Sequence, residues 1–236
     1  MVQALTPAQP SAQLGGPTLE LRGITKRFGA ATILEGLSVE IPLTGITFIV
    51  GASGSGKSVL CRLAVGLLKP DAGEVFLFGQ RVDTLPERKL QPLRARAPYL
   101  VQGPALLDWL TLKANVALAD PTAKHDGRAE AALERVGLAD FVDRKPPEVG
   151  PGIRKRAAIA RALVLKPEVL LLDEPTTGLD REAAGQVNDT LALVRDQGLG
   201  VALVSHDYDA LRKLADRVVQ VKDHRIGYCG PAKGFA

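Results

Sequence analysis

A glycine-rich stretch, Gly51-Ala-Ser-Gly-Ser-Gly-Lys57-Ser58, carries the strongest chemical signal in the chain. It fits the pattern G-x-x-x-x-G-K-[ST] and directly follows an apolar run at residues 46–50, which is the placement of a phosphate-binding loop. Glycines are needed there because they tolerate unusual dihedral angles and let backbone N–H groups approach phosphate oxygens closely. The sequence therefore predicts a nucleoside triphosphate site, and a chance glycine-rich turn is the alternative.

The residues of this loop have separate expected roles. Lys57 is expected to place its ammonium group at the β- and γ-phosphates of ATP, and the Ser58 hydroxyl to bind the accompanying Mg²⁺. A helix is expected to begin at Lys57, so that its N-terminal dipole favours the same anion. The expected nucleotide contacts in the loop are Gly51, Ser53, Gly54, Ser55, Gly56, Lys57, Ser58 and Val59.

Two adjacent acids, Asp173 and Glu174, form the second chemical feature. They follow the apolar run at residues 169–172 and precede a proline. Sheets of the α/β class place ligands at the carboxyl ends of their strands, and two carboxylates there need a cation. Asp173 is expected to hold Mg²⁺ through water, and Glu174 to polarise the water that attacks the γ-phosphate. The alternative is that both acids only end a strand and cap the helix near Arg181.

The elements that must position these residues follow from hydrophobic periodicity. Residues 18–23, 32–41, 46–50 and 74–78 are predicted strands, followed by a short strand at 99–102 and mainly helical segments from about 108 to 166. Strands at 169–172, 200–204 and 217–221 then alternate with helices at 181–197 and 208–215. This alternation favours a parallel sheet.

Composition limits the architecture. A chain of 236 residues with 46% hydrophobic content supports one sizeable core and a single α/β domain with a helical insertion. The net charge of +4 is small and its basic residues are scattered apart from Arg154-Lys-Arg156, so a nucleic-acid partner is not expected. Cys61 and Cys229 are too few for a disulfide framework, which favours a reducing compartment, and Cys61 is expected to be buried.

The domain boundaries follow from the same reasoning. No apolar stretch approaches the roughly 20 residues that a membrane-spanning helix needs, and the opening residues do not resemble a signal peptide, so we expect a soluble chain. Residues 1–17 are uncharged and rich in Ala, Gln, Pro and Gly, which predicts a flexible leader. Residues 18–230 are expected to form one nucleotide-binding domain, and residues 231–236 a C-terminal tail.

Taken in order, these motifs resemble the nucleotide-binding subunit of an ATP-binding cassette (ABC) transporter, over residues 19–227. The resemblance implies a P-loop NTPase of the α/β class, with a RecA-like core, an antiparallel β portion and a helical subdomain at about residues 103–160. It also implies ATP and Mg²⁺ as ligands. Two such cassettes close when ATP binds and reopen when it is hydrolysed.

Four further residues receive roles from the resemblance. Phe28 matches the aromatic residue that stacks on adenine, and Gln102 matches the glutamine that senses Mg²⁺ and the attacking water. Asp180 lies in the loop that communicates with the opposing subunit, and His206, which follows a predicted strand, matches the histidine that contacts the γ-phosphate. Each has a plainer alternative: Phe28 could cover the core, Gln102 could end a strand in solvent, and Asp180 or His206 could cap a helix.

One departure from the family pattern stands at residues 149–153. The Leu-Ser-Gly-Gly-Gln/Met signature is replaced there by Val149-Gly150-Pro151-Gly152-Ile153. In the family this motif closes over ATP bound to the partner subunit, so the resemblance makes Gly150 and Gly152 expected nucleotide contacts. Gly150 lacks the serine hydroxyl and Pro151 lacks an N–H. Glycine is acceptable as an N-cap and proline at the first helical position, so we expect the helix to form. Because the hydroxyl and one N–H are missing as donors to phosphate, we expect hydrolysis to slow.

Several segments are most similar to one branch of the family, the ATPases of Mce/Mla-type systems that move lipids across the bacterial envelope. These segments are Ser58-Val-Leu, residues 66–74, 93–96 and 103–111, and Gly152-Ile-Arg-Lys-Arg156. Residues 105–111 are also similar to importers of nitrate, sulfonate and related small solutes, which form the alternative. The resemblance implies a transmembrane permease, a second ABC subunit and an Mce-domain substrate-binding protein as partners, with this chain peripheral at the cytoplasmic face of the inner membrane.

Residues 103–118 are expected to receive the permease, because the resemblance places a coupling helix of the membrane subunit beside the glutamine loop. Leu107, Trp109 and Leu110 offer an apolar anchor, and tryptophan is enriched at interface hot spots. Burial of these side chains within the helical subdomain is the alternative.

The expected activity is transport-coupled ATP hydrolysis, with Lys57, Glu174 and His206 as catalytic residues and Ser58, Gln102 and Asp173 serving the metal. A nucleotide-gated regulatory subunit with little hydrolysis is a different class of function, which the altered signature favours and the intact Glu174 and His206 oppose. A cassette protein of translation or DNA repair is disfavoured, because those generally carry two cassettes or a long coiled-coil insertion.

Overall fold

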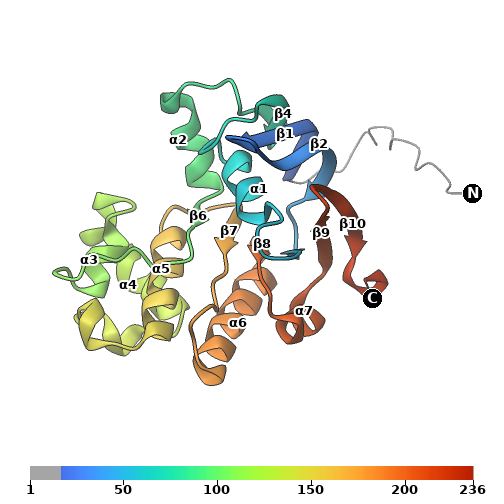
Figure 1. The fold of residues 1–236 in the computed structure, drawn as a ribbon. Helices are drawn as coiled ribbons and strands as arrows, with labels where there is room; N and C mark the ends of the chain where they lie inside the picture. Colours follow the sequence, from blue (N-terminus) through green and yellow to red (C-terminus); the bar gives the residue numbers. More distant parts are fainter. Residues whose placement is uncertain (1–16, 236) are drawn as a thin grey trace, which may run out of the picture.

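The computed structural model describes residues 17–235, so the expected leader lies outside the described residues except for Pro17. A six-stranded sheet with the order β10-β9-β3-β8-β7-β6 runs through the middle of the molecule (Figure 1). All its neighbouring strands are parallel except β10, which pairs antiparallel with β9. Its strands are β3 (Ile46–Val50), β6 (Tyr99–Leu100), β7 (Val169–Asp173), β8 (Gly200–Val204), β9 (Arg217–Lys222) and β10 (Arg225–Pro231).

A second, antiparallel sheet has the order β2-β1-β4-β5. It is made of the N-terminal strands and lies beside α1 in Figure 1. Its strands are β1 (Thr18–Phe28), β2 (Ala31–Pro42), β4 (Ala72–Leu77) and β5 (Gln80–Arg81). The fold is therefore an α/β core joined to an antiparallel β portion, as the sequence predicts.

Helices cover the central sheet and extend beyond its β6 edge. In Figure 1, α3, α4 and α5 form a group beside that edge, and these three helices pack against one another. The helices are α1 (Lys57–Ala64), α2 (Glu87–Arg96), α3 (Leu112–Ala117), α4 (Arg128–Arg135), α5 (Pro151–Leu163), α6 (Arg181–Asp196) and α7 (Tyr208–Leu214). Short 3-10 turns are η1 (Pro121–Lys124), η2 (Ala139–Phe141), η3 (Pro146–Glu148) and η4 (Ala232–Gly234). Within residues 17–235, no helix combines the length and the apolar character required to span a bilayer.

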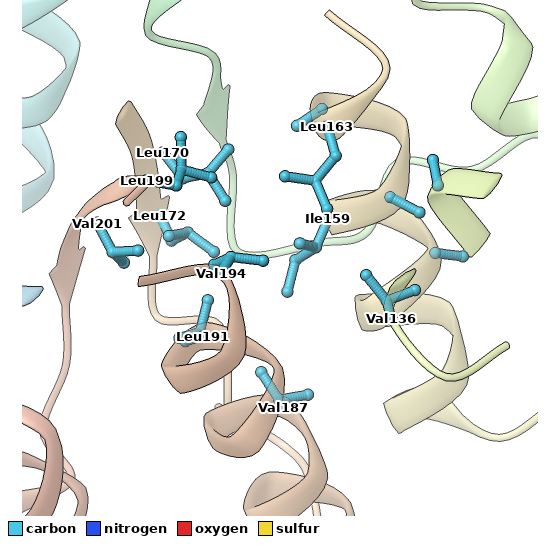
Figure 2. Close-up of a cluster of buried hydrophobic side chains, with 14 of the residues drawn as sticks. Val136, Ile159, Leu163, Leu170, Leu172, Val187, Leu191, Val194, Leu199 and Val201 are labelled. Carbon is cyan, nitrogen blue, oxygen red and sulfur yellow. The ribbon is translucent and has the colours of Figure 1, made fainter. Parts of the chain in front are cut away.

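The inner strands β3, β7 and β8 are buried along their whole length, which explains why they are nearly continuous apolar runs. Alternate residues of a strand point to opposite faces, so Leu170 and Leu172 join one core and Val169 and Leu171 the other. Figure 2 shows the first core, where side chains of β7 and β8 meet Ile159 and Leu163 of α5 and a row from α6. The second core lies between the sheet, α1 and the antiparallel strands, and contains the fully buried Cys61, as expected.

The predicted strands are confirmed, with β1 and β4 longer than expected. The expected strand at 99–102 is only two residues long, because β6 pairs with β7 at Tyr99 and Leu100 alone. Helix α2 and strand β10 were not predicted. Charged residues and Pro92 obscure the periodicity of α2, and most of the edge strand β10 is not buried. The segment predicted as a tail at 231–236 begins within β10 and continues into η4.

Candidate functional site

The site begins with the register of three neighbouring parallel strands. Ile49 of β3 pairs with Val204 of β8, and Val204 also pairs with Asp173 of β7. The loops that follow these strands therefore leave the sheet at the same edge. They carry the glycine-rich loop, the acid Glu174 and His206, so pairing of the strands assembles residues that are far apart in the sequence.

The glycine-rich loop requires glycine at two positions. Gly51 has φ of 152°, and a Cβ there would lie 2.3 Å from the Val221 carbonyl oxygen. Gly56 has φ of 101°, and its Cβ would lie 2.8 Å from Leu34 Cδ2. At Gly51 a side chain would collide with the backbone of β9, and at both positions the positive φ would strain any other residue. By contrast, a Cβ at Gly54 would meet no atom within 4 Å, so the loop backbone is open at that position.

Lys57 is the first residue of α1 and is only 5% exposed. Its Nζ donates to the carbonyl oxygens of Gly51 at 3.0 Å and Ala52 at 2.8 Å, within its own loop. Burial lowers the pKa of this ammonium group, and the negative charges of Glu174 and Asp173 partly oppose that shift. The loop thus holds a buried cation at the start of a helix, where an anion is favoured.

Asp173, at the end of β7, is 6% exposed and accepts a hydrogen bond at each carboxylate oxygen. Ser58 Oγ donates to Oδ1 at 2.8 Å, and Tyr99 Oη donates to Oδ2 at 2.7 Å. Burial, followed by the contact with Asp173, raises the pKa of the Tyr99 hydroxyl above its ordinary value, so Tyr99 remains a donor. A serine hydroxyl and a carboxylate in contact are hard oxygen ligands of the kind that Mg²⁺ prefers.

Glu174 follows Asp173 in the left-handed region, with φ of 48°. His206 Nε2 lies 2.9 Å from Glu174 Oε1, while Thr177 Oγ1 donates to Oε2 at 3.0 Å and Gln102 Nε2 at 3.4 Å. A non-glycine residue in this conformation is costly, and such strain is found at functional sites.

An open depression of about 370 Å³ lies over the glycine-rich loop. Phe28, which is 49% exposed and so does not cover the core, forms part of its wall, as do Glu174 and His206. The full lining is Phe28, Ile33, Ser53, Gly54, Gly56, Lys57, Ser58, Val59, Glu174 and His206. Asp207, not His206, caps α7, since its side chain accepts from Ala210 N.

The other predicted site residues do not line this depression. Gly51 packs under the loop, the buried Ser55 hydroxyl has no hydrogen-bond partner among the described residues, and Asp173 is covered by Ser58 and Tyr99. Gln102 reaches the site only through Glu174. Asp180 caps α6 by accepting from Ala183 N at 2.8 Å, which is the plainer of its two sequence-based interpretations.

Gly150 and Gly152 lie at the start of α5, away from the lining residues. Gly150 is the N-cap of α5 without a side-chain hydrogen bond, and Pro151 is its first residue, so the helix forms as predicted. Gly152 is buried, and a Cβ there would lie 2.8 Å from Ala183 Cβ at the start of α6. On the same helix, Lys155 donates to the Gln102 carbonyl oxygen.

Three residues that form or support the site, Tyr99, Thr177 and Ile33, were not predicted from the sequence. Tyr99 could have been found from the pairing of its strand with β7. Tyr99 pairs with Leu171, and this register brings its hydroxyl within reach of Asp173. Thr177 was expected only to begin the loop leading to Asp180, although it lies three residues after Glu174 and bonds to it. Ile33 lies in a partly exposed stretch of β2 and gives no sequence signal.

Comparison with known proteins gives the class of this site. The family model described as "ABC transporter" matches residues 34–177. The methionine import ATP-binding protein MetN of Mesorhizobium japonicum is 37% identical over 235 residues, covering 96% of this chain but 63% of that protein. The glutamate transport ATP-binding protein GluA of Corynebacterium glutamicum is 36% identical over 216 residues, covering 88% of each.

Solved structures agree with this family. A dimeric ATP-binding cassette in a post-hydrolysis state with ADP and phosphate has a TM-score of 0.79 and 28% identity, covering 92% of this chain and 100% of that one. The protein cbiO1 of Clostridium perfringens, part of the ABC transporter complex cbiONQ, has a TM-score of 0.82 and 27% identity, covering 91% of this chain and 88% of its own. The chain belongs to the ABC transporter family, whose cassettes bind ATP with Mg²⁺ and hydrolyse it.

The residues present fit this ligand. The loop backbone is open at Gly54, the start of α1 has no side-chain cap, and Lys57 supplies a buried positive charge. Ser58 and Asp173 supply oxygen ligands for Mg²⁺. The chain spans 63% and 62% of the length of two methionine-import relatives.

We predict that Tyr99→Phe lowers the free energy of unfolding by about 1–3 kcal/mol, because it leaves the buried Asp173 Oδ2 without its donor. Urea denaturation without nucleotide measures this. Tyr208→Phe is the matched control, since Tyr208 is 50% exposed. Equal stability of Tyr99→Phe and the unaltered protein would show that the hydroxyl does not hold Asp173.

Proposed function

We propose that this chain is the ATP-hydrolysing subunit of an ABC transporter, peripheral at the cytoplasmic face of a membrane and bound to a permease and a second cassette. The observation that carries this is the placement of Glu174. Its carboxylate faces the depression over the phosphate-binding loop and is held by His206 and Thr177. A positioned carboxylate beside bound phosphates is what activation of a water requires.

The residues divide the chemistry between them. Lys57 and the start of α1 bind and neutralise the phosphates, and Phe28 offers a ring face for the base. Glu174 orients and deprotonates the attacking water, and His206 donates to the γ-phosphate. Ser58 and Asp173 would hold Mg²⁺, with Gln102 beside Glu174 as the residue that responds to it. When bound, Mg²⁺ supplies charge neutralisation on the phosphate oxygens.

The partner cassette is expected to complete the site. Gly150 and Gly152 are proposed to approach ATP bound to that second subunit, and Asp180 to lie in the loop that faces it. The two subunits are either two copies of this chain or this chain and a different cassette. In the second arrangement, one composite site would keep an intact signature from the partner.

The proposed cargo is a small solute of amino-acid size. The relatives named above are a methionine importer subunit and a glutamate transport subunit, so the sequence-based expectation of an Mce/Mla-type lipid system with an Mce-domain partner lacks their support. The segments similar to Mce/Mla-type ATPases, which are residues 58–60, 66–74, 93–96, 103–111 and 152–156, remain the observations on the lipid side. Neighbouring genes distinguish a small solute from a lipid as the cargo. A gene for a solute-binding protein would support the small solute, and a gene for an Mce-domain protein would support the lipid.

We predict that Glu174→Gln lowers phosphate release by roughly 10²–10⁴-fold while Mg·ATP binding, measured by calorimetry, is retained. The amide preserves the size of the side chain but cannot take a proton. Glu182→Gln, on the exposed first turn of α6, is the control and should keep full activity. A nucleotide-gated regulatory subunit, which the altered signature favours, would release no phosphate even before substitution.

We predict that the double change Gly150→Ser and Pro151→Gly raises ATP turnover about tenfold or more, since each regained charge-assisted hydrogen bond contributes roughly 1.5–3 kcal/mol to closure. Turnover of the purified protein measures this. Gly150→Ala with Pro151→Gly restores the N–H without the hydroxyl and should give an intermediate rate. A rate equal to or below that of the unaltered chain would contradict a weakened signature.

The permease is proposed to dock on residues 103–118. Trp109 is 69% exposed in this segment, so its burial within the helical subdomain does not occur in this chain. Gly103 and Pro104 line part of an apolar depression of about 420 Å³. Val101 and Leu118 also line it and are 47% and 49% exposed. A segment that carries an exposed aromatic side chain and also lines an apolar depression suits a helix of the membrane subunit.

We predict that Trp109→Ala weakens association with the permease by about 2 kcal/mol or more, the loss typical of an interface hot spot. Co-purification of the two subunits from membranes, together with the melting temperature of the isolated variant, measures this. Leu193→Ala removes an exposed apolar side chain of α6 and is the matched control. If Trp109→Ala retains the permease as well as the control does, this docking surface is wrong.

A further inference from the structure

Asn115 of α3 is completely buried, although it carries a polar amide. Its Oδ1 accepts from Leu107 N at 2.7 Å. The two hydrogens of its Nδ2 are shared among the carbonyl oxygens of Leu107 at 3.0 Å, Leu110 at 3.1 Å and Thr111 at 3.1 Å. All four contacts go to one stretch of backbone, residues 107–111. The amide thus replaces the regular hydrogen bonds that this stretch lacks.

Few backbone hydrogen bonds lie within the turn formed by residues 107–111. Its one internal backbone hydrogen bond among those described runs from Leu110 N to the Leu107 carbonyl oxygen at 3.1 Å. At its end, Thr111 caps α3 by accepting from Ala114 N. Trp109 lies between these points and projects to solvent. The conformation in which Trp109 is presented therefore depends on the buried amide beneath it.

The backbone of residues 102–105, which precedes this turn, is held by side chains of α5. Arg161 of α5 donates to the carbonyl oxygens of Ala105 at 2.7 Å and Pro104 at 3.1 Å. Lys155, earlier on α5, donates to the Gln102 carbonyl oxygen. Between Gln102 and Ala105 the backbone is thus held by α5, and between Leu107 and Thr111 by Asn115 of α3.

We infer that Asn115 is a positioning residue for the permease: it fixes the turn at residues 107–111 so that Trp109 is presented in one conformation for docking. This inference rests on the proposed docking of the membrane subunit at Trp109. It goes beyond that proposal because it assigns the order of the surface to a residue that makes no contact with the partner. Asn115 does not line the nucleotide depression, so its effect on basal hydrolysis should be small.

The expected effect follows from the cost of ordering. A Trp109 turn that is mobile before docking must be immobilised when the permease binds, and one immobilised side chain weakens binding by about two- to tenfold. Trp109 is the single tryptophan in the chain, so its fluorescence reports on this turn alone. The motion of the turn can therefore be measured without a label.

The test compares Asn115→Leu, which keeps the branching and the number of side-chain heavy atoms and removes all four contacts, with Val187→Ala. Val187 is fully buried in α6 and supplies a loss of stability away from the turn. We expect Asn115→Leu to increase the fast component of the Trp109 fluorescence anisotropy decay and to reduce permease co-purification about two- to tenfold. Val187→Ala should change neither, and both variants should keep basal ATP hydrolysis.

Two further measurements keep the test decisive if Asn115→Leu does not fold. Asn115→Asp retains the acceptor for Leu107 N and places a carboxylate against three carbonyl oxygens, so it should also mobilise Trp109. In the unaltered protein, the Leu107 amide proton should exchange slowly with solvent because it donates to a buried oxygen. Exchange of that proton at the rate of an unstructured peptide would overturn the inference.

The outcomes separate this inference from the docking proposal. Unchanged anisotropy in a folded Asn115→Leu protein overturns the positioning role. A mobile Trp109 with undiminished permease retention overturns the link to docking, provided that Trp109→Ala loses the permease. If Trp109→Ala keeps the permease, the docking proposal itself fails, and the anisotropy then reports only on the turn.

Discussion

The parallel pairing of β3, β7 and β8 is the constraint on which the rest of the molecule depends. Because these strands are in register at one edge, the residues that follow them meet although they are distant in sequence. Ser58 and Asp173 are separated by 115 positions and yet share a hydrogen bond of 2.8 Å. Burial of alternate residues in two cores fixes the register, since a slip by one residue would turn each core side chain to the wrong face.

The same edge keeps opposite charges close without neutralising them. Among the described ion pairs none joins Lys57 to Asp173 or Glu174, and the lysine instead donates to two carbonyl oxygens of its own loop. Both acids are held mainly by hydroxyl, amide and imidazole groups. The site therefore presents a cation toward the place where phosphates bind and carboxylates toward the place where a metal ion and a water are needed.

Much of this could be predicted from the sequence, because strand periodicity and the order of the motifs are local features. The strands that end in Val50, Asp173 and Val204 are such cases, as is the start of α5 at a Gly-Pro pair. Other features depend on tertiary contacts that leave no periodic trace. Tyr99 reaches Asp173 only through the pairing of β6 with β7, and Asn115 looks like an ordinary helical residue until the turn beneath Trp109 is seen.

Cargo was the least predictable property, for a physical reason. The residues around the nucleotide must satisfy phosphate, metal and water in every cassette, so they do not vary with what is transported. Segments outside that site, such as residues 103–111, are proposed to contact other subunits and are the ones that favoured a lipid branch. Their similarity extends to more than one branch of the family, and the named relatives are a methionine import protein and a glutamate transport protein.

The contact between the first turns of α5 and α6 limits which of residues 150–152 can carry a larger side chain. At Gly152 an added methyl group would collide with Ala183 at 2.8 Å, whereas at Gly150 it would meet open space. A larger side chain at residue 150 would therefore leave the two helices in contact, whereas one at residue 152 would push them apart. Interhelical packing by itself is therefore a reason to keep a glycine at residue 152, whether or not that residue also contacts a nucleotide.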